Sequence, residues 1–69
     1  ELEKQVAAAE RAVSKAEERM KELDAAVEAS ASDYVKLQEI YADKQALEVE
    51  LEGLYAQWET LSAQLEEAR

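Results

Sequence analysis

The chain has 69 residues, a length that allows one small unit at the ~100 to 200 residues of an ordinary domain. Its 17 acidic and 8 basic side chains give a formal net charge of −9, so bulk attraction to nucleic acid is not expected. It has one glycine and no proline, cysteine or histidine, which excludes disulfides, zinc–thiolate sites and histidine-based catalysis. No apolar run approaches the ~18 residues of a membrane span, so we expect a soluble, cytoplasmic, helical protein with no membrane contact.

The first apolar pattern begins at Leu2 and ends at Val27. Its members are spaced alternately by four and three residues, which is the heptad pattern of a helix with one apolar seam. The seam consists of Leu2, Val6, Ala9, Val13, Ala16, Met20, Leu23 and Val27. This predicts a helix over residues 2–28. An acidic column runs beside the seam and consists of Glu3, Glu10, Glu17 and Asp24.

Residues 28–33 interrupt this pattern, because all six are small or polar. Ser30, Ser32 and Asp33 are each able to cap a helix start. We therefore predict a turn at residues 29–32 and a second helix that begins near Asp33. A stutter within one long helix would also shift the seam, but the capping residues and the apolar gap favour a turn.

A second seam follows, again spaced by three and four residues, and predicts a helix over residues 33–68. It consists of Leu37, Ile40, Lys44, Leu47, Leu51, Leu54, Trp58, Leu61, Leu65 and Ala68. Lys44 is its one charged member. We expect the stem of Lys44 to lie on the core while its ammonium group reaches toward Glu17, so that this polar position fixes the register.

The two seams complement each other, because the first is rich in alanine and valine and the second in leucine. Packing small residues against large ones favours pairing within the chain. The predicted fold is therefore all-α: a monomeric two-helix antiparallel coiled-coil hairpin. If the turn is centred near Ala31, Trp58 lies over Val6 and Ala9.

The same register would leave Leu65 and Ala68 extending beyond Glu1. Because the chain also begins with glutamate rather than methionine, we interpret residues 1–69 as a single hairpin from the C-terminal end of a larger protein. We expect the first helix of that protein to begin earlier.

Three tyrosines, Tyr34, Tyr41 and Tyr55, occupy one column beside the second seam. We expect their rings to cover the seam and their hydroxyl groups to stay solvated. The small residues predicted to lie beneath them are Ala8, Ala12 and Ala26. The alternative is a docking face for a partner. Base stacking is less favoured, because no lysine or arginine is interleaved with the rings.

The basic residues of the first helix are the candidate nucleic-acid contact. They are Lys4, Arg11, Lys15, Arg19 and Lys21. Residues 1–27 contain seven acidic and five basic residues, whereas residues 28–69 contain ten and three. The simpler interpretation is a solvated face with intrahelical ion pairs. Phosphate contact requires positive charge to dominate locally, within a screening length of ~8 Å.

Adjacent carboxylates such as Glu17 and Glu18, or Glu66 and Glu67, are the only pairs that suggest acid–base or metal chemistry. Without histidine or a concave wall to raise a pKa, we interpret them as surface charge. We therefore predict no catalytic, cofactor-binding or metal-binding residue in this chain.

The second half resembles the C-terminal coiled-coil domain of ABC-F ATPases of the Uup type. The resemblance is carried by Tyr34 with Leu37, by Leu47-Glu48-Val49-Glu50-Leu51-Glu52, and by Leu54-Tyr55-Ala56-Gln57-Trp58-Glu59-Thr60-Leu61. The form Leu-Tyr-x-x-Trp-Glu-x-Leu is the most distinctive part. The alanine-rich first helix is generic, so the resemblance covers about half of the chain.

This resemblance implies a non-catalytic appendage of a soluble ATPase with two nucleotide-binding domains, and ATP and Mg²⁺ as cofactors of that parent protein. Proteins of this family are associated with ribosomes, translation and antibiotic resistance, and the domain in Uup-like members with DNA. The implied partners are DNA, ribosomal RNA or the parent ATPase domains. The turn lacks the proline often found in the family, and the negative charge leaves only the basic face of the first helix for nucleic acid. The alternative function is a structural spacer or a protein-docking coiled coil.

Overall fold

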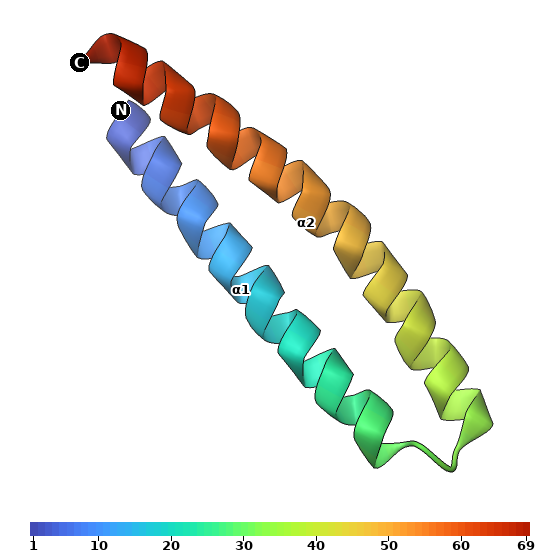
Figure 1. Ribbon diagram of the computed structural model, residues 1–69. Coiled ribbons are helices and arrows are strands. Elements are labelled where there is room, and N and C mark those ends of the chain that lie inside the picture. Colours follow the sequence, from blue (N-terminus) through green and yellow to red (C-terminus); the bar gives the residue numbers. More distant parts are fainter.

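Two long helices account for nearly the whole chain in the computed structural model, which describes all 69 residues. Helix α1 spans Leu2–Ala29 and helix α2 spans Tyr34–Ala68. They pack side by side in opposite directions, so that both termini lie at one end and the turn at the other (Figure 1). The molecule measures 53 × 15 × 12 Å. The predicted all-α antiparallel hairpin is confirmed, and the alternative of one continuous helix with a stutter is wrong.

The turn is fixed by backbone hydrogen bonds at the end of α1 and by a side chain at the start of α2. The Ser30 N–H donates to the carbonyl oxygens of Ala26 and Val27, which ends α1. The Asp33 N–H donates to the Ser30 carbonyl at 2.9 Å. The Asp33 carboxylate then accepts from the Lys36 N–H at 3.1 Å. Of the three possible capping residues, Asp33 therefore starts α2, because its side chain satisfies a backbone donor that has no partner within the helix.

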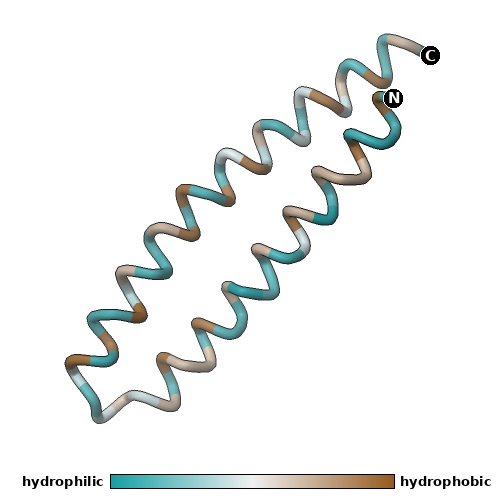
Figure 2. Tube along the Cα trace, turned by 180° about the vertical axis from the view of Figure 1, so that it is seen from behind, coloured by the Kyte–Doolittle hydropathy of each residue, from teal (hydrophilic) through white to brown (hydrophobic).

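The core is a thin line of small and branched side chains between the helices. Only four residues are buried: Ala9, Ala16, Leu23 and Leu47. Partly buried residues pack against the central cluster of Ala16, Leu23 and Leu47, and these are Met20, Ile40, Leu51 and Leu54. Figure 2 shows apolar residues recurring at helical intervals along both helices. Three of the four buried residues come from α1, which is the expected result of pairing small residues with large ones.

The pairing register differs from the predicted one by about one helical turn. Trp58 lines a hollow with Glu10 and Val13, which lie further along α1 than the predicted position over Val6. Leu65 is likewise level with the start of α1, because it lines a shallow depression with Glu1, Leu2 and Glu3.

The cause of this difference lies at the turn. The prediction assumed that both helices begin level with each other on either side of Ala31. In the structure Leu37, the first seam residue of α2, is partly buried, and the Lys44–Asp24 and Tyr55–Glu17 contacts show that α2 is displaced along α1 from a level start. Each seam residue of α1 therefore faces a position about one turn further along α2 than predicted.

Candidate functional site

The basic residues of α1 are all exposed, and four of them share one face of the helix. Lys4, Arg11, Lys15 and Arg19 are separated by seven, four and four residues. At about 100° per residue, they fall within an arc of about 80°. We call these four residues the cationic face. Lys21 projects in a different direction, so it does not belong to this face.

Acidic residues interrupt the cationic face without neutralising it through ion pairs. Glu18 lines the same shallow surface depression as Arg11 and Lys15. The two ion pairs of the structure lie elsewhere: Lys44 with Asp24, and Arg69 with Glu66. The guanidinium and ammonium groups of the cationic face therefore point into solvent, where they are able to meet a ligand without breaking an internal contact.

Lys44 joins the two helices through an ion pair. Its Nζ lies 2.7 Å from a carboxylate oxygen of Asp24, whereas the sequence predicted that it would reach Glu17. The shifted register is the reason, since it brings Asp24 opposite Lys44. The hydrogen bond to Asp24 raises the pKa of Lys44 above its ordinary value of 10.5, and nearby negative charge adds to this effect. The ammonium group also lies 5.9 Å from the centre of the Tyr41 ring.

Glu17 is instead the partner of Tyr55. The Tyr55 hydroxyl donates to the Glu17 carboxylate at 2.6 Å, a second polar contact between the helices. This hydrogen bond raises the pKa of the Tyr55 phenol above 10.0, with smaller contributions from burial and from the Glu17 charge. Both contacts join the acidic column of α1 to the tyrosine side of α2. Both contacts are specific to this register, because sliding one helix along the other would separate the two side chains of each pair.

The three tyrosines have different surroundings. Tyr34 is 72% exposed, and its hydroxyl accepts a hydrogen bond from the Gln38 side chain of the same helix. Tyr41 is 51% exposed and Tyr55 is 39% exposed. The hydroxyl of Tyr55 was predicted to stay solvated, but it donates to Glu17 instead. Ala8 and Ala12 line a depression with Gln5, Ala9, Gln57 and Leu61.

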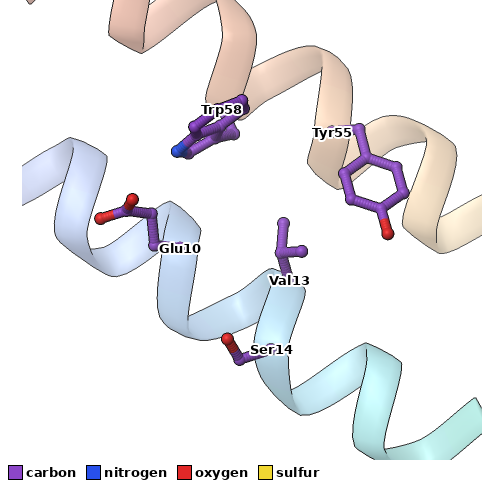
Figure 3. A pocket seen from close by; sticks show the side chains of 5 residues that line it. All are labelled: Glu10, Val13, Ser14, Tyr55 and Trp58. Atoms are coloured by element: carbon purple, nitrogen blue, oxygen red, sulfur yellow. The ribbon is translucent and has the colours of Figure 1, made fainter.

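A hollow opens beside Trp58, at the join between the helices. It has a volume of ≈ 260 Å³ and is lined by Glu10, Val13, Ser14, Tyr55 and Trp58. Figure 3 shows the two aromatic side chains projecting from α2 and the other three residues from α1. Sequence reasoning missed this hollow, because its lining depends on which residues face Trp58. The Trp58 ring is only partly buried, although its Nε1 atom is buried without a hydrogen-bond partner.

The acidic residues do not gather into a metal site. No group of three or more potential ligands converges anywhere in the chain. The neighbouring carboxylates Glu17 and Glu18, and Glu66 and Glu67, are all exposed. Neither helix is long and apolar enough to span a membrane.

The chain was also compared with known protein families, curated proteins and solved structures. The family described as "ABC transporter C-terminal domain" matches residues 1–63, which is most of the chain. No curated protein and no solved structure shows significant similarity. The family match extends over α1, the turn and nearly all of α2.

Proposed function

Because this chain belongs to the family of ABC transporter C-terminal domains, we propose that it is a non-catalytic appendage of an ATP-binding cassette ATPase that contacts DNA or ribosomal RNA through α1. ATP and Mg²⁺ belong to the catalytic domains of such a protein. The hairpin supplies a rigid, exposed surface instead of a reaction site. The observation that carries the proposal is the cationic face of α1.

The dimensions of the cationic face suit a nucleic-acid backbone. Lys4 and Arg19 are fifteen residues apart, which is about 22 Å along the helix at 1.5 Å per residue. A duplex presents one phosphate charge per ~1.7 Å of its axis, so each of the four cations is able to find a phosphate over this length. Arg11 and Lys15 line a depression formed by residues of α1 alone, whereas Arg19 lines one that it shares with Asp43 and Glu50 of α2.

The rest of the molecule limits this contact to one side. Helix α2 presents Glu52, Glu59 and Glu66 in one column, and these carboxylates repel phosphate. Binding must therefore be weak, confined to α1 and strongly dependent on salt, since its free energy comes from the release of counterions. Contact with bases has no support, because no aromatic residue lies among the four cations.

Titration of duplex DNA, or of a ribosomal RNA hairpin, into the labelled 69-residue chain tests the proposal. The double variant Arg11→Gln/Lys15→Gln should weaken binding strongly. It should also reduce the slope of log affinity against log salt by about 1.8, because two phosphate contacts are lost. Both positions are exposed on α1, so the hairpin should remain folded.

The matched control is Lys21→Gln/Lys36→Gln, which changes the net charge by the same amount at two exposed positions outside the cationic face. It should leave the affinity within about twofold, since screening weakens distant charges. Equal losses in the two double variants would contradict a localised contact. Absence of binding even at low salt would overturn the proposal for both nucleic acids and leave the structural or protein-docking function.

A further inference from the structure

One long edge of the hairpin is strongly acidic. The contacts Tyr55–Glu17 and Lys44–Asp24 bring the acidic column of α1 against the tyrosine side of α2. Glu52 and Glu59 lie three residues before and four residues after Tyr55, so they share its face of α2. We call this surface the acidic edge. Its members near the hollow are Glu10, Glu17, Glu52 and Glu59.

Positive charge is nearly absent from this part of the edge. The cations within the edge itself are Lys21 and Lys44, which lie toward the turn, and Lys44 is already paired with Asp24. Arg11 and Lys15 share a depression with Glu10 on its other side, but neither forms an ion pair with it. Two aromatic rings therefore line a hollow whose wall includes Glu10, on an edge that also carries Glu17, Glu52 and Glu59. Aromatic faces attract cations, tryptophan most strongly, and neighbouring carboxylates add to this attraction.

We propose that the acidic edge binds a basic segment of a partner protein, with an arginine or lysine side chain inserted in the hollow beside Trp58. The cation would lie against the rings of Trp58 and Tyr55, with the Glu10 carboxylate at its rim (Figure 3). The ≈ 260 Å³ of the hollow accommodates one long side chain but not a folded element. The apolar stem of such a side chain would pack on Val13.

Other occupants fit this surface less well. An anionic ligand meets four carboxylates, and a metal ion finds no convergent set of ligands. An apolar peptide would leave Glu10 desolvated at the rim without a partner. A second copy of this chain is the remaining competitor, since its cationic face carries the required charge. Light scattering distinguishes that case, because it predicts dimers in the absence of any peptide.

Trp58 is the only tryptophan, so its fluorescence reports directly on the hollow. The 69-residue chain would be titrated with a short peptide of alternating arginine and glycine, and with the same peptide carrying neutral citrulline in place of arginine. The arginine peptide should change the emission of Trp58 with a saturable curve, whereas the citrulline peptide should not. The Trp58 indole N–H resonance should shift in parallel.

Glu10→Gln is the test variant, because it removes one rim charge from an exposed position and leaves the shape unchanged. It should weaken binding about two- to fivefold, the effect of losing one partly exposed charge contact. The control is Glu22→Gln, which changes the net charge equally on another exposed face of α1 and should leave the affinity unchanged.

Three outcomes would each overturn the proposal. The first is equal weakening by Glu10→Gln and Glu22→Gln, which would show attraction to net charge alone. The second is an arginine peptide that binds without changing Trp58. The third is no binding at low salt. A dimer whose formation is abolished by Glu10→Gln would assign the hollow to a second copy of this chain instead.

Discussion

The half of the hairpin near the turn and the half near the termini have the same heptad spacing but different packing. Residues 16–51 contain the cluster of Ala16, Leu23 and Leu47 and the Lys44–Asp24 ion pair. In the outer half Ala9 is the single buried residue, although Leu61, Leu65 and Trp58 all lie in its seam.

The size of the facing side chains accounts for this difference. Near the turn, leucines from both helices cover each other, because Leu23 and Leu47 are of similar length. In the outer half the side chains of Glu10 and Val13 are too small to cover the whole Trp58 ring, so a hollow remains beside it. A regular seam thus specifies the pairing of two helices, while the volumes at each level decide how much surface is buried.

The largest expected loss of stability comes from removing a buried side chain in the inner half, the half near the turn. Leu47→Ala removes a side chain that is 8% exposed, and buried leucine-to-alanine changes cost ~2 to 4 kcal/mol. Leu65→Ala, in the outer half, should cost about 1 kcal/mol, because Leu65 already contacts water. Urea denaturation followed by circular dichroism measures both. Equal losses would mean that the two halves are packed alike.

Trp58 offers a second comparison, within the outer half. Trp58→Ala should cost about 2 to 3 kcal/mol, less than for a fully buried ring, because one side of the indole faces the hollow. Trp58→Phe should cost less than about 1 kcal/mol, since it retains an aromatic ring and removes the buried Nε1–H that has no partner. Thermal melting of the two variants would show this order. A phenylalanine variant as unstable as the alanine variant would mean that the stabilisation depends on the full indole ring and not on aromatic surface in general.

The outer half also contains a glycine inside a helix, which lowers the stability of the hairpin relative to alanine. Gly53 lies inside α2 without a positive φ, and a Cβ added there meets nothing within 4 Å. Gly53→Ala should therefore stabilise the hairpin by about 0.5 to 1 kcal/mol, because alanine loses less backbone entropy in a helix. Thermal melting again measures the change. A lower melting temperature would mean that position 53 requires glycine for a reason that this structure does not contain.

The smallest effect concerns the Tyr55–Glu17 hydrogen bond, which joins the two halves. Because the pKa of Tyr55 is raised in the folded state, this bond stabilises the hairpin below about pH 10, and its contribution is lost as the pH rises through the folded pKa. Tyr55→Phe should be slightly less stable than the unsubstituted chain at neutral pH. The difference should disappear in strongly alkaline solution, as measured by urea denaturation at the two pH values. A difference that grows with pH would reverse the assigned direction of the shift.

The sequence predicts the helices and their antiparallel pairing, because both depend on spacing that is local to each helix. The register depends on the turn, where small differences in the path of residues 30–33 displace a whole helix. The start of α2 near Asp33 was predicted from the capping residues, but the sequence carries no signal for the path of the chain that leads to it from Ser30. The partners of Lys44, Tyr55 and Trp58 all follow from the register. The hollow could therefore not be predicted from the sequence, whereas the basic residues of α1 could be identified from their spacing alone.

The placement of both termini at one end also determines how the molecule responds to mechanical load. A force that separates Glu1 from Arg69 pulls across the helix pair instead of along it (Figure 1). Contacts then break one level at a time, as in a zipper, beginning with Leu2 and Leu65 and reaching the Leu23–Leu47 region last. The hairpin opens at low force from its base, and its best-packed segment, nearest the turn, is the last to part and the first to close.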